Sequence, residues 1–334
     1  MLKFGLIGLG RIGKRHLSLI HQVGKLVALC DTNKQAFEGV KMDEGVLVFY
    51  SLEDLLREKH DIDLMVICTP NYLHASQAIS LLNFGYNVLC EKPMAMSVSE
   101  CMQMNATARK NGRRLFVVKQ NRFNPPVVKL KELIENGSLG AIYSVQVNGF
   151  WNRNEDYFKN SWTASKEKAG GILHTQFSHF LDITSWLFGE LHVVHTLSSN
   201  QSKRVDFNYD DTFVISGKFV LGALVNFHFS INSFSSNMEG SLTVLAEKGS
   251  VKIGGQYLNT LDYFCVQGIE KIELAEGAMA NNYGSYSGSM SNHHLVYRNI
   301  LEVFNGESQV ATTGEDGIKT LEMIDLIIQS KSEY

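Results

Sequence analysis

Three glycines near the start of the chain have the spacing of a phosphate-binding turn. Residues 8–13 read G-L-G-R-I-G, directly after an apolar run that begins at Lys3 and before residues with helical periodicity. In this G-x-G-x-x-G pattern the first glycine makes the tight turn, the second lets the backbone approach a pyrophosphate, and the third lets the helix pack on the strand. The helix N-terminus then presents N–H groups to the phosphates. The stretch predicts dinucleotide binding by Gly8, Gly10, Arg11, Ile12 and Gly13.

A second apolar run ends in an acid that suits ribose recognition. Residues 25–31 read K-L-V-A-L-C-D, so Asp31 follows the glycines by roughly the twenty residues typical of dinucleotide-binding folds. A carboxylate at this place accepts hydrogen bonds from the adenosine ribose and repels the 2′-phosphate of NADP. The predicted cofactor is therefore NAD, and Lys34 is the nearby cation through which NADP would be tolerated.

Length and composition argue against several other classes of protein. The chain has 334 residues, of which 44% are hydrophobic and 19% charged, and a net charge of −3, which is typical of a globular protein with two domains. We expect neither a nucleic acid nor a membrane as partner, because basic runs and long apolar runs are missing. We also expect no signal peptide, because residues 1–3 lead directly into the predicted dinucleotide fold. The five cysteines form no C-x-x-C pair and no metal-binding spacing with histidines, which favours a reducing cytoplasm and no metal.

The N-terminal part alternates between apolar strands and helices. Strands are expected to end at residue 7 and to span 25–31, 45–50, 64–68, 86–90 and 115–119. Ser51 with Asp54, and Ser97 with Glu100, have the spacing of capping boxes for helices that end near residues 59 and 111. Such alternation predicts a parallel, doubly wound Rossmann sheet covered on both faces, which makes residues 1–122 the NAD-binding domain.

The pattern changes in the second part of the chain, residues 123–334. A helix is expected from Pro125 to Gly137, and alternating apolar and polar residues predict strands at 142–151, 212–219, 223–231, 241–246 and 250–253. A loop at 152–168 leads to a helix over 171–188, and helices over 292–304 and 314–329 follow a segment rich in glycine, serine and tyrosine. This α+β domain would have an open, mostly antiparallel sheet, whose exposed face is covered by the helix or by another subunit.

Six short motifs, in this order and spacing, resemble the Gfo/Idh/MocA family, which includes glucose-fructose oxidoreductase, inositol dehydrogenase and rhizopine-catabolism-like oxidoreductases. They are GLGRIG at 8–13, CTPNYLH at 68–74, EKP at 91–93, AGG at 169–171, SHFLD at 178–182 and TTGEDG at 312–317. The resemblance covers essentially the whole chain. It implies NAD(P)-linked oxidation or reduction of a sugar or polyol, with the active site between a Rossmann domain and a domain with an open-faced sheet.

The resemblance also implies roles for individual residues. Lys92 matches the catalytic lysine of the family, and His179 matches the histidine that commonly transfers the proton of the substrate hydroxyl. Glu91 would lie beside the nicotinamide. The other residues that would line the cofactor are Thr69, Pro70, Asn71, His74 and Lys92. The chain departs from the common family pattern at Ala169, Thr175 and Phe177, which bears on substrate contacts rather than on the proton-transfer pair.

The pair of Lys92 and His179 has the chemistry that alcohol oxidation requires. A secondary alcohol gives up hydride readily only as its hydroxyl proton leaves, and a histidine with an ordinary pKa of about 6.5 exchanges that proton near neutral pH. A lysine ammonium at the same oxygen stabilises the developing negative charge. Either residue would serve as the formal base. In a helix over 171–188, Thr175 and His179 would share a face, and Asp182 would orient the His179 ring. Judged by local sequence alone, a core histidine and a solvated lysine are the commoner explanations.

Residues outside the motifs are candidates for binding the substrate. Arg122 and Asn124 follow the sixth strand, where they either hold substrate or fix the junction of the domains. Trp162 and Thr175 complete the predicted substrate set with Lys92 and His179, although aromatic residues more often fill cores. The loop that contains Trp162, together with residues 71–74, looks most like family members that act on nucleotide sugars. Among these it is most similar to UDP-N-acetylglucosaminuronate 3-dehydrogenases of polysaccharide biosynthesis.

Three functions stay open at this point. The first is an NAD-dependent dehydrogenase for C3 of a UDP-linked N-acetylhexosamine or its uronic acid, and the second is a polyol or inositol dehydrogenase. The third is a non-catalytic NAD-binding regulator, since a fold does not fix a function. The presence of both Lys92 and His179 favours an enzyme. The family also implies a homodimer or homotetramer that forms through the C-terminal sheet.

Overall fold

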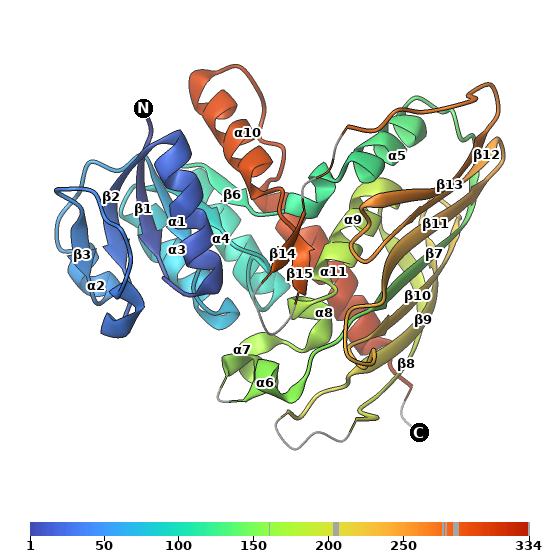
Figure 1. Cartoon of the computed structure of the whole chain (residues 1–334), viewed down its shortest axis with the longest axis horizontal. Coiled ribbons are helices and arrows are strands. Elements are labelled where there is room, and N and C mark those ends of the chain that lie inside the picture. The colour runs from blue at the N-terminus through green and yellow to red at the C-terminus, as the bar shows by residue number, and fades with distance from the viewer. Residues whose placement is uncertain (160, 203–206, 276, 278, 283–286, 333–334) are drawn as a thin grey trace. The chain divides into compact units, whose positions relative to one another are not determined.

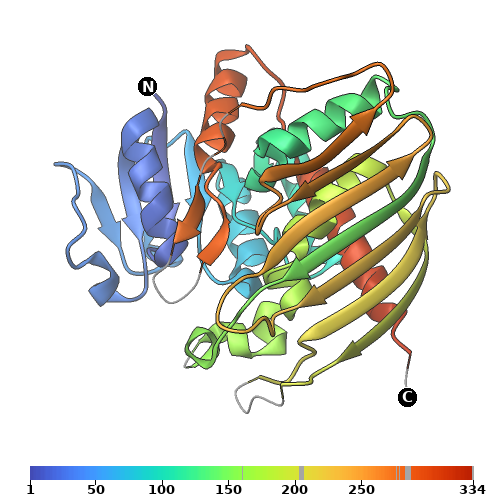
Figure 2. The ribbon, with the colours of Figure 1, turned by 45° about the vertical axis from the view of Figure 1, so that its right-hand side comes forward.

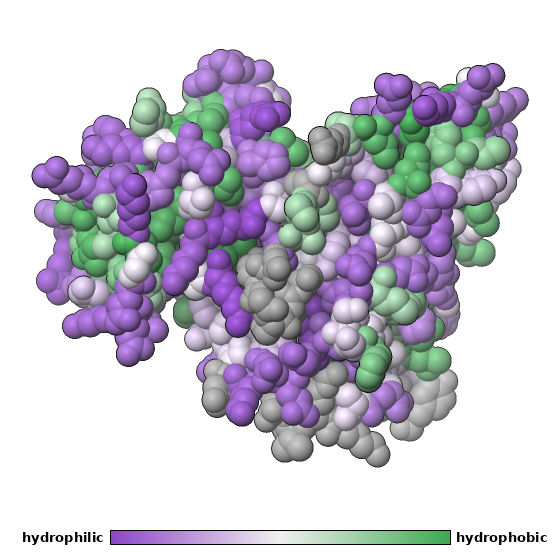
Figure 3. Space-filling view, viewed as in Figure 1, coloured by the Kyte–Doolittle hydropathy of each residue, from purple (hydrophilic) through white to green (hydrophobic). Residues whose placement is uncertain are grey.

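The computed structural model describes residues 1–159, 161–202, 207–275, 277, 279–282 and 287–332 (Figure 1). The chain divides into two compact units, one formed by residues 1–118 and 293–318 and the other by residues 119–292 and 319–334. The first unit is thus built from two separate stretches, and the boundary near residue 122 stays a prediction. Among the described residues, no helix combines the length and the hydropathy that crossing a membrane requires. On the face shown in Figure 3, hydrophilic side chains predominate and hydrophobic ones form smaller groups between them.

The first unit contains a six-stranded parallel sheet with the order β3-β2-β1-β4-β5-β6. Its strands are β1 (Lys3–Ile7), β2 (Lys25–Cys30), β3 (Leu47–Phe49), β4 (Leu64–Ile67), β5 (Asn87–Cys90) and β6 (Leu115–Val117). Its helices are α1 (Arg11–Val23), α2 (Leu52–Leu55), α3 (His74–Asn83), α4 (Val98–Lys110) and, from the C-terminal stretch, α10 (His293–Asn305), which packs on α1. All four residues of β4 are buried, as expected for a strand covered on both faces. The predicted Rossmann sheet is confirmed.

Side-chain caps begin two of these helices. The Ser97 hydroxyl accepts a hydrogen bond from the Glu100 N–H at 3.2 Å, and the Glu100 carboxylate accepts one from the Ser97 N–H at 3.1 Å, so the capping box before α4 is confirmed. The Ser51 hydroxyl accepts from the Asp54 N–H at 3.0 Å before α2. This helix ends at Leu55 and not near residue 59. Because Leu55 is its single buried residue, little packing is available to stabilise a longer helix.

The second unit contains a seven-stranded sheet with the order β13-β12-β11-β7-β10-β9-β8. Its strands are β7 (Ile142–Phe150), β8 (Leu191–Ser199), β9 (Thr212–Phe219), β10 (Leu224–Ser230), β11 (Glu239–Ala246), β12 (Gly249–Gly254) and β13 (Thr260–Val266). Only β7 and β10 pair in parallel, which confirms an open, mostly antiparallel sheet. The sequence did not predict β8 and β13. They are the two edge strands, and β8 buries only Leu191 and Thr196, so its apolar alternation is weak.

Helices cover one face of the seven-stranded sheet. The unit contains η3 (Gln120–Phe123), α5 (Pro125–Glu135), α6 (Glu155–Phe158), η4 (Trp162–Ala164), α7 (Lys166–Ala169), α8 (Ile172–Thr175), α9 (Ser178–Phe188) and most of α11 (Gly314–Gln329), with a small hairpin of β14 (Ala280–Asn282) and β15 (Ser287–Met290). Figures 1 and 2 show α5, α9 and α11 on one side of the sheet. The opposite face carries hydrogen-bonded polar side chains, among them Gln146, Asn148 and Asn226, and no helix from the described part of this unit.

The helix predicted over 171–188 is two helices, α8 and α9. The N–H of Phe177 bonds to the carbonyl of Ile172, five residues earlier, and the regular ladder resumes with the carbonyl of Phe177. The Phe177 ring is fully buried and stacks on Phe229 at 4.6 Å between ring centroids. It also packs against Gly149, where an added Cβ would lie 2.6 Å from the ring. Packing of this aromatic residue therefore accompanies the break that puts Thr175 and His179 on different helices.

Candidate active site

The residues with predicted cofactor roles follow neighbouring strands of the parallel sheet. Gly8 comes directly after β1, Asp31 after β2, Thr69 just beyond β4 and Lys92 just beyond β5. Parallel strands present their carboxyl ends at one edge, and β1 and β4 are the adjacent strands at which the strand order reverses. Ligands of doubly wound sheets bind at this switch point. The fold therefore brings these residues to the ligand-binding edge of the first unit.

The turn at residues 8–13 fits a bound pyrophosphate. Gly8 has a φ of +89°, and a Cβ on Gly13 would lie 1.9 Å from the Gly8 carbonyl oxygen, so both positions require glycine. A Cβ on Gly10 would meet no described atom within 4 Å, and no described side chain caps the N-terminus of α1. Open space above an uncapped helix start is what an anion needs.

The Asp31 carboxylate braces this turn and keeps capacity for a ligand. Its Oδ2 accepts a hydrogen bond from the Leu9 N–H at 2.6 Å, and its Oδ1 accepts one from the Asn33 N–H at 2.8 Å. A carboxylate has about four acceptor positions, so two bonds leave room for ribose hydroxyls. Arg11 is exposed and Ile12 half-buried at the start of α1.

We predict opposite outcomes for alanine at two glycines of the turn. Gly13→Ala places a methyl group against backbone and should lower the midpoint of thermal unfolding clearly. Gly10→Ala has an allowed φ of −70° and open space, so it should leave the midpoint nearly unchanged and weaken NADH binding about tenfold or more by crowding the phosphates. Differential scanning fluorimetry and NADH fluorescence titration measure the two effects. Wild-type NADH affinity in Gly10→Ala would contradict the placement of the phosphates.

His74 links two loops at the sheet edge. Its Nδ1 lies 2.7 Å from the Pro93 carbonyl oxygen and its Nε2 lies 2.8 Å from that of Thr69. The side chain is buried, and burial lowers the pKa of His74 even though both carbonyl oxygens favour a proton on the ring. Thr69 and Pro70 are half-buried and Asn71 is buried. His74 therefore fixes the loop after β4 to the loop after β5, and its contact with the cofactor stays a prediction.

Lys92 and Glu91 lie next to each other but differ in exposure. Lys92 is half-buried, and its bond to Pro93 is cis. Glu91 is buried, its Oε2 accepts a hydrogen bond from the Lys92 N–H at 2.9 Å, and its Oε1 lies 2.9 Å from His16 Nε2. Burial alone would raise the pKa of Glu91, but hydrogen bonds from His16 and His293 outweigh it and hold this pKa well below the usual range. A direct contact of Glu91 with the cofactor stays a prediction.

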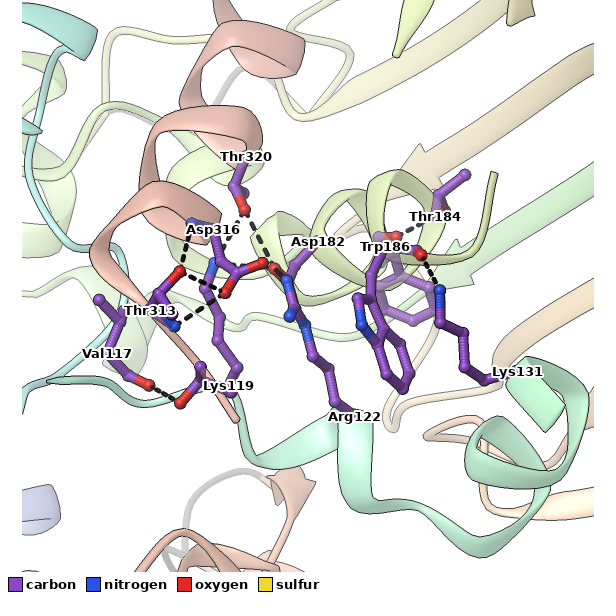
Figure 4. Close-up of polar contacts among 12 residues, drawn as sticks. Val117, Lys119, Arg122, Lys131, Asp182, Thr184, Trp186, Thr313, Asp316 and Thr320 are labelled. Atoms are coloured by element: carbon purple, nitrogen blue, oxygen red, sulfur yellow. Dashed lines mark hydrogen bonds and ion pairs between the residues drawn. The ribbon is translucent and has the colours of Figure 1, made fainter. Parts of the chain in front are cut away.

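In the second unit, His179 is buried in the first turn of α9, one turn before Asp182, whose polar contacts are shown in Figure 4. The Asp182 carboxylate accepts two hydrogen bonds from Arg122, at 2.9 and 2.7 Å, and lies 3.0 Å from Lys119 Nζ. Thr320 Oγ1 is 3.1 Å from the same carboxylate. Burial alone would raise the pKa of Asp182, but the two cations hold it far below the ordinary value. Asp182 thus anchors the helix that carries His179 to η3 and α11.

The other predicted substrate residues hold protein groups. Arg122 donates hydrogen bonds to the Asp182 carboxylate. The Asn124 side chain donates to the carbonyls of Tyr257 and Leu258 and accepts a hydrogen bond from Asn292 at 2.7 Å. Both side chains are buried, and the partners named here all lie in the second unit. Their contact with substrate stays a prediction.

Thr175 and Trp162 lie on different short helices of the second unit. Thr175 Oγ1 donates to the Gly171 carbonyl at 2.9 Å and contacts Gln176, while Trp162 is half-buried at the start of η4. Gln176, which the sequence interpretation missed, is buried and donates to the Tyr157 hydroxyl at 2.8 Å. Lys119 was also missed as a partner of Asp182, because a lysine at the end of a predicted strand is more often solvated.

Comparison with known proteins decides the family. The NAD-binding Rossmann fold model of the Gfo/Idh/MocA oxidoreductase family matches residues 2–119, and the C-terminal alpha/beta domain model of that family matches residues 131–334. The chain belongs to the Gfo/Idh/MocA oxidoreductase family. The resemblance seen in the sequence is confirmed, and with it an oxidoreductase whose first unit is an NAD-binding domain.

Individual members of the Gfo/Idh/MocA family show the range of relatives. The WlbA dehydrogenase from Bordetella pertussis, whose crystal structure is a complex with NADH and UDP-GlcNAcA, is 33% identical with a TM-score of 0.86, over 98% of this chain and 96% of that one. Inositol 2-dehydrogenase of Rhizobium meliloti is 26% identical over 99% of this chain and 97% of its own length. A 1-carboxy-3-chloro-3,4-dihydroxycyclohexa-1,5-diene dehydrogenase of Comamonas testosteroni is 31% identical, but the match covers 54% of this chain and 46% of that protein.

Proposed function

We propose that this protein is an NAD-dependent dehydrogenase of a nucleotide sugar, which oxidises the C3 hydroxyl of a UDP-linked N-acetylhexosamine or its uronic acid. The observation that carries the proposal is the similarity, over 98% of the chain, to a dehydrogenase crystallised with NADH and UDP-GlcNAcA. The motif residues Lys92 and His179 support it, because they are the residue types that alcohol oxidation requires.

Lys92 and His179 would act on the same hydroxyl group. When NAD is bound, it supplies the acceptor for the hydride that leaves the alcohol carbon. The proton leaves the hydroxyl oxygen for Lys92 or His179, and the carbon–oxygen bond becomes a carbonyl. The other residue of the pair donates a hydrogen bond to this oxygen and stabilises the charge that develops on it. Gly8, Gly10 and Asp31 would hold the dinucleotide, and Asp182 would keep α9 in place.

We also propose a homodimer or homotetramer that forms through the open face of the seven-stranded sheet. This face combines polar groups such as Asn148 and Asn226 with apolar side chains such as Leu224 and Leu245, which are 58% and 48% exposed. Partly apolar sheet faces of this kind are suited to pairing with a second copy. The proposed nucleotide-sugar substrate would place the enzyme in polysaccharide biosynthesis. The four buried free cysteines support a cytoplasmic location, where thiols stay reduced. Light scattering of the purified protein tests the oligomer.

A substrate panel tests the proposed activity. The protein is incubated with NAD and UDP-sugars, UDP-sugar acids or free polyols, while NADH fluorescence and the mass of each product are recorded. A loss of two hydrogens from a UDP-sugar or UDP-sugar acid is the expected result. Oxidation of free polyols alone would instead favour an inositol-type dehydrogenase. The full-length similarity to inositol 2-dehydrogenase supports this alternative. Tight NADH binding without turnover of any compound would favour an NAD-binding regulator.

A further inference from the structure

A buried chain of hydrogen bonds ends at the backbone of Lys92. The Tyr297 hydroxyl is 2.8 Å from His16 Nδ1, His16 Nε2 is 2.9 Å from Glu91 Oε1, and Glu91 Oε2 accepts the N–H of Lys92 at 2.9 Å. His293 Nε2 lies 3.4 Å from the same Glu91 oxygen, and its ring is edge-on to that of His16. All of these side chains belong to the first unit and none is more than 5% exposed, except that of Lys92.

The direction of the donors follows from the chemistry of the groups. Burial raises the pKa of Tyr297 well above its ordinary value, so this hydroxyl keeps its proton and is able either to donate to His16 Nδ1 or to accept from it. The ionised Glu91 carboxylate can only accept, so His16 carries a proton on Nε2 and donates to it. Burial lowers the pKa of His293 to about 4, so its ring is neutral at pH 7. Every bond of the chain Tyr297, His16, Glu91 and Lys92 N–H therefore has one donor and one acceptor.

We infer that Glu91, His16 and Tyr297, with His293 packed beside them, are positioning residues that fix the backbone from which Lys92 reaches the reacting hydroxyl. This inference rests on the proposed catalytic role of Lys92. The two consecutive residues differ in exposure. The Glu91 side chain is buried in the unit and held there by hydrogen bonds, while the Lys92 side chain is partly exposed. His74, which bonds to the carbonyl of the next residue, Pro93, holds the other side of the same loop.

His16, Glu91 and His293 have the residue types of a metal site, since their ligand atoms lie within 4.8 Å of one another. Hydrogen bonds account better for the distances. His16 has both ring nitrogens engaged at 2.8 and 2.9 Å, and both Glu91 oxygens face donors. A divalent metal bound to His16 Nε2 would displace the proton that now lies between His16 and Glu91. Of the two hydrogen bonds of His16, only the one with Tyr297 would then be kept.

The test compares Glu91→Gln with wild type in the substrate assay. A glutamine cannot accept hydrogen bonds from both His16 and the Lys92 N–H, so the loop shifts. We expect kcat to fall about 10- to 100-fold, with NADH affinity and the thermal midpoint little changed and a larger isotope effect for substrate deuterated at the oxidised carbon. Tyr297→Phe removes only the terminal hydroxyl and should lower kcat less. His60→Asn, a buried histidine at the opposite edge of the sheet, is the matched control and should keep the wild-type kcat.

A double variant separates positioning from a general structural role. If Glu91 acts through Lys92, Glu91→Gln should have little further effect on kcat in a Lys92→Met background. Multiplying effects in the double variant, or wild-type kcat in a folded Glu91→Gln protein, would overturn the inference while leaving the proposed function intact. One equivalent of bound metal that Glu91→Gln removes would also overturn it. An active Lys92→Met protein would refute the proposed mechanism instead.

Discussion

Lys92→Met is expected to lower kcat for the nucleotide sugar by about 10³-fold, because methionine retains the length of the side chain but removes its charge and its proton. NADH affinity should change little, since the phosphates and the ribose are assigned to residues 8–13 and Asp31. Stopped-flow measurement of NADH formation under single-turnover conditions gives the rate of the chemical step without product release. A fluorescence titration with NADH gives the affinity.

Lys92→Arg separates charge from proton transfer in the same experiment. Arginine retains a positive charge but does not release its proton, so a variant with partial activity would assign Lys92 to charge stabilisation and His179 to the base. An inactive arginine variant with normal NADH binding would point to Lys92 as the base. Lys92→Met with the turnover of the wild type would refute the mechanism.

Asp182→Asn is expected to lower the free energy of unfolding by about 3–5 kcal/mol, because it leaves the buried cations Arg122 and Lys119 without their carboxylate. Urea denaturation followed by circular dichroism measures this change. Asp61→Asn is the matched control, since Asp61 pairs with Lys3 at the surface and exposed pairs contribute little. Equal stability of Asp182→Asn and wild type would show that the cluster in Figure 4 does not hold the helix of His179.

The stability that Asp182 contributes should also depend on pH. Its pKa is depressed in the folded protein, so its contribution is fully present above the unfolded pKa of about 3.9 and is lost as the pH falls below it. The difference in unfolding free energy between wild type and Asp182→Asn should therefore be constant from about pH 5 to 8 and shrink below about pH 4. A difference that shrinks between pH 5 and 7 would assign the effect to another group.

The Rossmann sheet could be predicted because each of its strands follows a local rule. Parallel strands covered on both faces are continuous apolar runs, as in β4. The turn at residues 8–13 requires glycine at Gly8 and Gly13 because a Cβ there would meet backbone atoms, and the G-x-G-x-x-G spacing shows this requirement directly. The edge strands β8 and β13 follow no such rule, since one bears few buried residues and the other buries little besides Val266.

The contacts of the candidate site were harder to predict, because they join distant parts of the chain. Lys92 and His179 were found through short motifs, but nothing in the spacing of His16 and Glu91 shows that a helix and a strand end bring them together. Likewise the contacts of the Asp182 carboxylate with Arg122 and Lys119 were not predicted, and its effect on the His179 ring stays a prediction. A buried charge must be paired, but its partners come from elements far apart in the sequence, which the hydrophobic periodicity of the sequence does not identify.

Residues 293–318 complete the first unit only after the whole of residues 119–292 has been made. During synthesis on the ribosome, β1 to β6 and their helices emerge first, while His293 and Tyr297 are still absent. Until α10 has been made and docks, the nascent unit lacks the Tyr297 and His293 side chains that contact His16 and Glu91. A protein truncated after residue 292 should bind conformation-sensitive chaperones, and the loop of Lys92 should acquire its final geometry in the last step of folding.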